Sequence, residues 1–472
     1  MVWEATTNTA SPYTLTAIAR TFNDAFGTGG TDLFDIFMHH RTVAGEWMHA
    51  TGHLSAATTL VIDTVIDGSN GTLEVAWTAG TIDVTNDVPA DSQSAAVRIN
   101  EAQSFTAAEK AQGRVNTYAA PFDALAFSGM QVNGGMEVSQ ERGTTAVTLA
   151  TGTESYVIDQ WTARFARAAT LAIDAQQVSS PTPPAGLQFG LQLKATTGLT
   201  PLAAGDYATL STPIEGYRVS RLALGGSSAQ SISIGFWVYA TIAGTMAVTL
   251  TNSANNRSYV TDVVIDSAAT WEYKTLTVPG DTSGTWLTTN GIGLRAIFCF
   301  GCGSTFQGTA GSWQASQIFG SSSTTNFMAS TNNVAVIAGV VVLPGIELPA
   351  SDRAALILRP FDQELLLASR YWQKTYSYAT APGTATSAGS IRMYTATTTN
   401  YLLMQAFFVP TMQGIPTLTI YDDLGASGKV FKGTNGKTSA TTSVNEKSAN
   451  IGTLDATSAS ELGFQYVASS RL

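Results

Sequence analysis

The chain has 472 residues, a formal net charge of −10 and only 12% charged residues. Such an acidic chain is unsuited to binding nucleic acid or anionic lipid, because both are bound by basic surfaces. No apolar run approaches the roughly 18 residues of a membrane-spanning helix, so membrane insertion is not expected. The length predicts three or four domains of roughly 150 residues each.

Residues 1–92 have the pattern of a small β-domain. Strands are expected at Tyr13–Ala17, Leu60–Asp63, Leu73–Trp77 and Thr81–Val84. Glycine-rich and Asn-rich turn signals separate these segments. The pattern contains no helical period, so we expect a compact sheet.

Four histidines of this domain lie close together, at His39, His40, His49 and His53. The spacing of His49 and His53 is that of a helical metal-binding pair. The surrounding EWMHATGHLS is typical of a strand and turn, in which this pair does not converge on one ion. A solvated surface is therefore the favoured interpretation. The alternative is a cation held by three copies of the cluster around an axis.

Residues 93–125 form a connector, and its central part predicts a helix over about 105–117. This part is rich in Ala, Gln, Glu, Lys and Arg and has no strand period. Thr106 and Glu109 match the capping-box pattern that marks a helix start. The apolar surface of the helix is thin, so we expect it to be marginal alone and to form a narrow neck as three packed copies.

Residues 126–355 carry the pattern of a large antiparallel β-unit. From Ile232 to Val238 every second residue is apolar, which is the period of a strand lying on a core. Short strands with turn signals between them follow as far as Pro279-Gly280, and no helix interrupts them. This arrangement predicts an antiparallel jelly-roll sandwich.

Residues 356–472 begin with a helix and continue as a second β-unit. Pro360 marks the boundary, and Asp362–Thr375 has apolar residues at helical spacing with Asp362 as N-cap. Strands such as Tyr401–Val409 follow. The predicted fold class is therefore mainly β and multidomain. It has a central antiparallel jelly-roll sandwich flanked by small β-domains, a short neck helix and one helix near 362–375.

Several segments resemble a known group of proteins. They are VWEATTNTASPYTL with GEWMHATGHLS, FTAAEKAQGRVNTYAAPFDALAFSGMQVNGGMEVSQERG, the run from GFWVYA to TWEYKTLTVPGDTSGTW, ELLLASRYWQKTYSY, and FVPTMQGIPTLTIYDDLGASGKV. In this order they resemble virion structural proteins of tailed bacteriophages, their fibres and spikes. Those proteins have an N-terminal virion-attachment domain, a connector, a jelly roll similar to carbohydrate-binding modules and a C-terminal domain. Glu46 and Trp47 match the attachment domain, whereas the histidines do not.

The resemblance implies a homotrimeric, non-catalytic fibre or spike that attaches to other virion proteins by its N-terminal domain and binds host-surface polysaccharide. We expect it in the virion, an extracellular particle assembled in the host cytoplasm. The start MVWEATTNTAS agrees, since it lacks the features of a secretory signal. Two alternatives stay open: a capsule-degrading depolymerase, and a structural head, collar or tail decoration without ligand. The sequence has no β-helix repeat of the kind usual in depolymerases.

Tryptophans are the candidate carbohydrate-binding residues, because the flat C–H faces of sugars stack on exposed indoles. Trp286 follows a polar loop, and Trp313 lies inside the Gly301–Thr325 loop. Trp237 lies on the strand face opposite Phe236. We predict sugar binding for all three tryptophans, with core or intersubunit packing as the alternative.

No catalytic residue is predicted. The chain has no nucleophile or phosphate-binding motif, and its histidines all lie near the N-terminus. Paired carboxylates for glycoside hydrolysis are possible among the 34 acidic residues, of which Asp262, Asp266, Glu272 and Asp281 cluster in sequence. Roles in turns and on solvated strand faces are favoured for them.

No metal or other cofactor is predicted. Cys299-Phe-Gly-Cys302 has CxxC spacing, but it ends a strand and lacks the further ligands of a zinc site. Packed thiols are favoured, with a local disulfide or an axial metal as the alternative. Jelly rolls of this type often hold a structural Ca²⁺, for which Asp159, Glu215 and Asp281 are available. The spacing selects none of the three.

Overall fold

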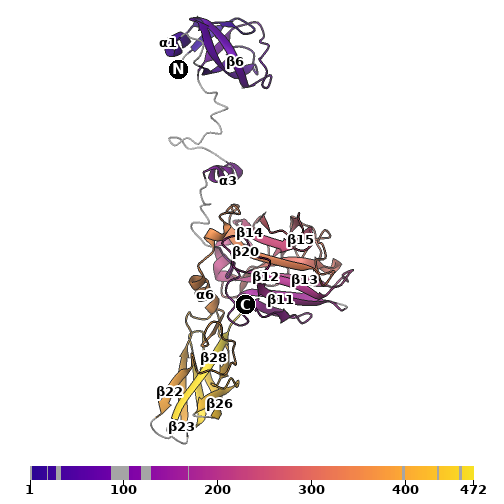
Figure 1. Cartoon of the computed structure of the whole chain (residues 1–472), viewed down its shortest axis with the longest axis vertical. Coiled ribbons are helices and arrows are strands. Elements are labelled where there is room, and N and C mark those ends of the chain that lie inside the picture. The colour runs from indigo at the N-terminus through magenta and orange to yellow at the C-terminus, as the bar shows by residue number, and fades with distance from the viewer. Residues whose placement is uncertain are drawn as a thin grey trace. The chain divides into compact units, whose positions relative to one another are not determined.

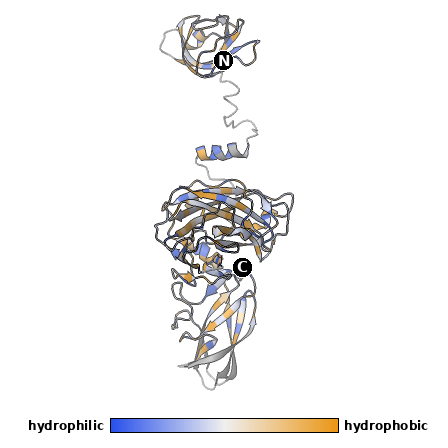
Figure 2. Cartoon of the chain, turned by 90° about the vertical axis from the view of Figure 1, so that its right-hand side faces the viewer, coloured by the Kyte–Doolittle hydropathy of each residue, from blue (hydrophilic) through white to orange (hydrophobic). Residues whose placement is uncertain are grey.

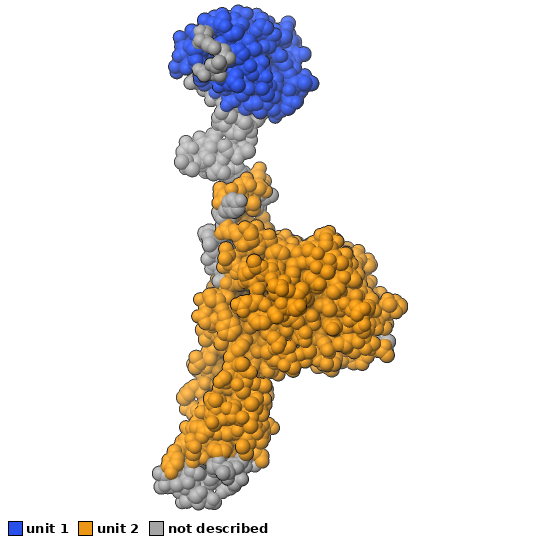
Figure 3. All heavy atoms as spheres, in the orientation of Figure 1, with its two compact units in different colours: residues 1–105 blue, residues 106–472 orange. Residues whose placement is uncertain are grey.

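The structure is a computed structural model that describes residues 3–18, 20–27, 33–86, 106–117, 129–167, 170–395, 399–432, 435–456 and 460–472. The chain divides into two compact units, Met1–Phe105 and Thr106–Leu472 (Figure 3). Of the predicted connector 93–125, only residues 106–117 are among those described. Antiparallel strands dominate each unit, which confirms the mainly β prediction. No helix in the described ranges is both long enough and apolar enough to cross a membrane.

The first unit is a seven-stranded antiparallel sheet with the order β2-β6-β5-β4-β7-β1-β3. Its elements are β1 (Trp3–Thr6), β2 (Tyr13–Thr14), β3 (Thr16–Ala17), α1 (Phe22–Phe26), β4 (Phe34–His40), β5 (Trp47–Ala56), β6 (Thr59–Gly68) and β7 (Ile82–Thr85). Met48, Ala50 and Leu54 of β5 are buried in the core of this unit, so the strand has the expected period of two.

The second unit begins with helix α3 (Ala107–Asn116). The Thr106 hydroxyl accepts a hydrogen bond from the Glu109 amide at 3.2 Å. In return, the Glu109 carboxylate accepts one from the Thr106 amide at 2.7 Å. This reciprocal pair is the predicted capping box, and it confirms the helix expected over about 105–117.

Two antiparallel sheets form a jelly-roll-like sandwich in the second unit (Figure 1). The seven-stranded sheet has the order β19-β16-β15-β18-β13-β10-β9. Its strands are β9 (Glu154–Ile158), β10 (Trp161–Ala166), β13 (Tyr207–Glu215), β15 (Gly244–Thr251), β16 (Ser258–Ile265), β18 (Ile292–Cys302) and β19 (Trp313–Gln314). The short helical turns beside them are α5 (Gly216–Val219), η1 (Ser220–Leu222) and η2 (Ser304–Phe306).

The six-stranded sheet lies opposite, with the order β17-β14-β20-β12-β11-β8. Its strands are β8 (Val147–Thr148), β11 (Ala172–Val178), β12 (Gly190–Thr197), β14 (Ile232–Ala240), β17 (Glu272–Val278) and β20 (Val334–Pro344). The sandwich core lies between the two sheets, and apolar residues recur along their strands (Figure 2). Every second side chain of Ile232–Val238 is buried there, as predicted.

Strand β20 is apolar along almost its whole length because both of its faces are covered. Val340 and Val342 point into the sandwich core. Val341 and Leu343 pack in a separate cluster with Leu358 and its neighbours from the turn η3 (Ala354–Ile357). The segment after β20 therefore shields one end of the outer face of the six-stranded sheet.

Helix α6 (Phe361–Ser369) leads from the sandwich to the C-terminal sheet (Figure 1). The helix expected near 362–375 is shorter than predicted, because its second half is strand β21 (Trp372–Lys374), which pairs with β28. The N-cap is Pro360 rather than Asp362. The remaining strands are β22 (Ile391–Thr395), β23 (Thr399–Phe407), β24 (Thr417–Tyr421), β25 (Lys429–Lys432), β26 (Asn435–Val444), β27 (Ser448–Ala456) and β28 (Ser460–Ser469).

A buried polar network joins the sandwich to this C-terminal part. Arg370 donates to the Glu215 carboxylate from Nε at 3.0 Å and from Nη2 at 2.7 Å. The Tyr371 hydroxyl donates to the same carboxylate at 2.7 Å. Since Glu215 is buried at the end of β13, these bonds anchor the chain just after α6 to the sandwich.

Candidate functional site

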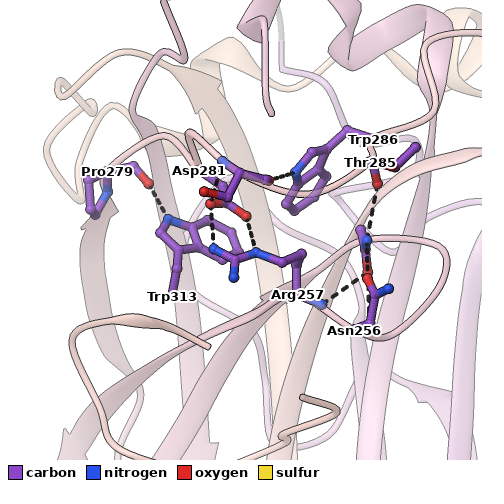
Figure 4. A network of polar contacts seen from close by, with 9 residues as sticks. Asn256, Arg257, Pro279, Asp281, Thr285, Trp286 and Trp313 are labelled. Carbon is purple, nitrogen blue, oxygen red and sulfur yellow. Dashed lines mark hydrogen bonds and ion pairs between the residues drawn. The ribbon is translucent and has the colours of Figure 1, made fainter. Parts of the chain in front are cut away.

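The structure brings Trp286 and Trp313 together at one end of the sandwich (Figure 4). Their ring centroids are 5.5 Å apart and the rings are nearly perpendicular, at 84°. The indole of Trp286 donates to the Ser283 carbonyl at 3.1 Å, and that of Trp313 donates to the Pro279 carbonyl at 2.8 Å. Both polar groups are thus already satisfied within the protein.

An ion pair holds the loop that carries Trp286. Arg257 contacts Asp281 through two hydrogen bonds, and the Asp281 carboxylate also accepts one from the Ser283 amide at 3.1 Å. Trp286 itself is 8% exposed and belongs to the sandwich core, and Trp313 packs against that core. Little of the Trp286 ring is free to stack on a sugar, so this geometry gives it a packing role. Sugar binding at Trp286 and Trp313 stays a prediction.

Trp237 lies elsewhere, on the outer face of the six-stranded sheet. It is directly opposite Tyr273 of the neighbouring strand β17, with ring centroids 5.3 Å apart. Tyr239, two residues further along β14, packs against Trp271 at 5.7 Å. All four rings are half-buried. We call these residues, Trp237, Tyr239, Trp271 and Tyr273, the aromatic face.

Glycines make room for this face. A Cβ on Gly190 of β12 would lie 3.5 Å from Cη2 of Trp271, so the indole reaches over the neighbouring strands. Gly339 of β20 adopts φ +57° beside Trp237, where a Cβ would stand 3.3 Å from Cδ1 of the indole. The rings therefore lie along the sheet instead of projecting from it.

Sequence reasoning found Trp237 but not its three partners. The sequence does contain a pattern that marks these partners: each of two segments has two aromatic residues that are two positions apart. The pairs are Trp237 with Tyr239 and Trp271 with Tyr273. Residues two apart lie on one face of a strand, so each pair marks an aromatic face.

The outer face of the seven-stranded sheet carries a small polar hollow of about 50 Å³. Six of its lining residues are Glu154, Arg164, Thr209, Ser211, Arg295 and Phe319. Arg295 forms an ion pair with Glu154. Nε of Arg164 is buried and has no hydrogen-bond partner in the described part of the chain. With two arginines and one carboxylate, the hollow is locally basic on an acidic protein.

The loop after β18 covers the other half of this outer face. Thr249 donates to the Phe319 carbonyl at 2.9 Å, and the Ser321 hydroxyl donates to the Asp262 carboxylate at 2.7 Å. Cys299 and Cys302 are buried beneath the loop as free thiols. Burial raises the pKa of the Cys299 thiol, and a hydrogen bond with Cys299 lowers the pKa of Cys302.

The four acids that cluster in sequence are not brought together as a free carboxylate pair. Asp266 and Glu272 both pair with Lys274, at 2.7 and 2.6 Å. Asp262 accepts from Ser321 and Asp281 from Arg257, as described above. Each of these carboxylates therefore has a partner of its own.

The proposed Ca²⁺ ligands are also separate. Asp281 pairs with Arg257, and Glu215 pairs with Arg370. Asp159 accepts from the Gln140 amide nitrogen at 2.7 Å, and burial raises its pKa. Among the residues that the structure describes, no three His, Cys, Asp or Glu side chains gather as metal ligands would.

The histidines of the first unit have separate partners. His53 lies 2.7 Å from Asp63, His49 lies 3.7 Å from Asp35, and His39 lies 3.6 Å from Asp83. His40 is buried on the opposite face of β4, where its Nδ1 accepts from the Val43 amide at 3.0 Å. The four histidines are thus close in sequence but do not form a set of metal ligands within one chain.

No family model and no curated protein matches this chain. Solved structures are similar to it over less than half of its length. The enzymatically active domain of tailspike protein 4 of bacteriophage CBA120 aligns with 39% of this chain and 19% of its own, at 12% identity and a TM-score of 0.23. The family 11 carbohydrate-binding module of a Clostridium thermocellum cellulase aligns with 42% of this chain and 98% of its own, at 14% identity and a TM-score of 0.22.

Proposed function

We propose that this protein is a non-catalytic fibre or spike protein of a tailed-phage virion that binds host-surface polysaccharide through the aromatic face. The observation that carries the binding proposal is the set of four half-buried rings on the outer face of one sheet. Aromatic residues have an apolar body that gains from contact with the C–H faces of sugars. A row of rings along a sheet suits an extended chain of sugars better than a single one.

Two features of the aromatic face support a binding role over simple packing. Nε1 of Trp271 is buried without a hydrogen-bond partner in the described part of the chain. The hydroxyl of Tyr273, in contrast, donates to the Pro349 carbonyl at 3.1 Å, which fixes its ring beside Trp237. A rigid apolar platform loses little side-chain entropy on binding, because its rings are already ordered.

Trimer formation is part of the proposal. Exposed apolar side chains gather in two stretches of the second unit, one near α6 and one that runs through β23 and beyond it. They are Ile346, Leu356, Leu366, Leu403, Phe407, Val409, Ile415 and Leu424. Contact with sister copies would cover such residues, and three weak sugar sites would then act together through avidity. The mass in solution by light scattering tests this: three times the 49.5 kDa chain is expected, and a monomer contradicts it.

Binding to a panel of purified bacterial surface polysaccharides tests the aromatic face. We expect Trp237→Ala and Trp271→Ala each to weaken binding about tenfold or more, since each removes one stacking surface. Tyr394→Ala, which removes an exposed ring from β22 outside the proposed trimer contact, serves as the matched control. Full binding by the Trp237→Ala/Trp271→Ala double variant, with unchanged circular dichroism, would show that the site lies elsewhere.

The same panel separates the two rival functions. A depolymerase would release new reducing ends from at least one polysaccharide, whereas the proposed binding protein releases none. The pairing of Asp262, Asp266, Glu272 and Asp281 with other side chains supports the non-catalytic proposal. A decoration without ligand would bind none of the panel and would not adsorb to any host cell.

A further inference from the structure

A second concave region lies at the junction between the sandwich and α6, away from the aromatic face. Two adjoining hollows of about 270 and 250 Å³ share the residues Glu137, Gln188 and Phe361. Arg359 and Glu364 line the first hollow, and Tyr378 lines the second. Together these hollows reach the range of roughly 300–1,000 Å³ that is typical of small-molecule sites. We call this region the junction cleft.

Two aromatic rings form an exposed corner of the junction cleft. Phe361, at the start of α6, is 41% exposed, and Tyr378 is 38% exposed. Their centroids are 5.3 Å apart and the rings meet at 79°. The Tyr378 hydroxyl accepts a hydrogen bond from the Ser139 amide at 2.8 Å and donates one to the Glu137 carbonyl at 3.2 Å. Tyr378 is therefore held in place while much of its ring stays in contact with solvent.

The two carboxylates of the cleft have different surroundings. Glu364 accepts hydrogen bonds from the Asn133 amide at 2.7 Å and from Arg359 at 2.8 Å, so its charge is compensated. Glu137 is half-buried, and its carboxylate has no hydrogen-bond or ion-pair partner among the residues described. An acceptor that is partly withdrawn from water and left unpaired costs free energy until a donor reaches it. Glu137 is thus ready to accept hydrogen bonds from a ligand.

We propose that the junction cleft binds a neutral sugar unit. The hydroxyl groups of the sugar would donate to the Glu137 carboxylate, and its C–H face would lie against the corner formed by Phe361 and Tyr378. The exposed amide of Gln188 adds a donor and an acceptor on the facing wall. Because Arg359 compensates Glu364, Glu137 leaves the cleft negatively charged, which disfavours uronic acids and other acidic sugars.

This site does not depend on the aromatic face. Its residues come from the 133–139 segment, the loop before β12 and the region around α6, whereas the aromatic face lies on β14 and β17. The proposed site also gives a role to the segment ELLLASRYWQKTYSY. Glu364 begins this segment and Tyr378 ends it, and Phe361 lies just before it. A sugar-binding fibre with both sites would contact a glycan at two separate places on each chain.

Saturation-transfer NMR on the full chain tests the proposal. The probes are the methyl glycosides of glucose, galactose, mannose and N-acetylglucosamine at millimolar concentration, with methyl glucuronide as the acidic counterpart. We expect at least one neutral glycoside to bind and the glucuronide to bind more weakly. Glu137→Gln and Phe361→Ala should each raise the Kd about tenfold, for a lost charged hydrogen bond and a lost stacking surface.

Matched variants make the result specific. Glu446→Gln changes an exposed glutamate outside the cleft, and Tyr394→Ala removes an exposed ring outside it. Neither should change the Kd, and Trp237→Ala should not change it either, so failure of the aromatic-face proposal leaves this test intact. Absence of binding by every neutral glycoside overturns the proposal. The proposal is also overturned if Glu137→Gln and Phe361→Ala leave the Kd unchanged. It is overturned as well if Trp237→Ala raises the Kd as much as these two variants do.

Discussion

Arg257 and Asp281 form a bidentate ion pair beneath the two tryptophans at the end of the sandwich. Nε of Arg257 donates to Oδ2 at 2.7 Å, and Nη2 donates to Oδ1 at 2.6 Å. The Asp281 side chain is 2% exposed, and its carboxylate also fixes the Ser283 amide. Ser283 in turn accepts from the Trp286 indole. The ion pair therefore determines where Trp286 and its loop lie.

Asp281→Ala should destabilise the sandwich strongly, because it leaves the Arg257 guanidinium without its partner. We expect the free energy of unfolding to fall by about 3 kcal/mol, the scale for breaking a buried pair from one side. Urea unfolding followed by tryptophan fluorescence measures this. Asp352→Ala, at an exposed position, is the control and should change stability by less than about 0.5 kcal/mol. Equal stability of the two variants would contradict a structural role for the ion pair.

Trp286→Ala and Trp237→Ala should differ in stability, because one tryptophan lies in the core and the other on an outer face. Trp286 is part of the sandwich core, so its truncation should cost about 3–5 kcal/mol of unfolding free energy. Trp237 is half-buried on an outer face, so we expect a cost nearer 1 kcal/mol and a fully folded variant at room temperature. Thermal unfolding of the two proteins side by side measures the difference. A Trp237→Ala variant as unstable as Trp286→Ala would mean that the aromatic face is a second core.

Glu137→Gln should stabilise the protein at neutral pH. Burial and the nearby charge of Glu364 raise the pKa of Glu137 above its usual value near 4.5, while Arg359 pairs with Glu364. The folded state therefore holds the proton more tightly than the unfolded state. The favourable contribution of Glu137 is complete below the unfolded pKa and is lost as the pH rises through the folded pKa. The neutral amide does not suffer this loss.

Unfolding midpoints measured from acidic to neutral pH test this sign. At pH 7 the unfolding midpoint of Glu137→Gln should be higher than that of the wild type. The difference should vanish at a pH below the pKa that Glu137 has in the unfolded state. Glu446→Gln, at an exposed site, should follow the wild type throughout. A Glu137→Gln variant that is less stable at pH 7 would indicate that the carboxylate has an essential partner in the folded protein.

Local patterns in the sequence predicted an element correctly where the contacts that stabilise this element are also local. The alternation in β14 and the Thr106–Glu109 capping box both lie within a few residues of the chain, and both are confirmed. The helix expected to reach residue 375 ends at Ser369 because Trp372 pairs with Ser469, a partner far along the chain. Helical spacing alone carries no information about such a strand.

The candidate site shows the same limit. Trp286 follows a polar loop, which favoured an exposed ring, yet its indole nitrogen is satisfied by Ser283 and its ring fills the core. Trp271 and its neighbour Tyr239 belong to separate segments of the sequence, so neither segment alone predicts their contact. The aromatic face exists only once β14 and β17 are paired, and the junction cleft only once α6 is placed against the sandwich.

The buried pair Cys299 and Cys302 leads to the last prediction. Both thiols are buried under the loop after β18, and a Cβ on Gly320 of that loop would lie 2.7 Å from Sγ of Cys302. We expect a thiol reagent such as Ellman's reagent to leave the native protein unmodified and to titrate two thiols after unfolding. The intact mass without reductant should be that of the free dithiol. A mass lower by two hydrogens would mean that the pair forms a disulfide.

Ser321→Ala should expose these thiols transiently. Its hydroxyl donates to both oxygens of Asp262, at 2.7 and 2.8 Å, and so holds the loop on the sheet. Loss of this charge-assisted bond should make local opening easier, and we expect thiol modification about tenfold faster without a matching fall in global stability. Ser316→Ala, at an exposed position of the same loop, should react at the wild-type rate, because the bond that Ser316 accepts from Ser258 is made by its backbone carbonyl. If Ser321→Ala reacts no faster than Ser316→Ala, some other contact keeps the loop closed over the thiols.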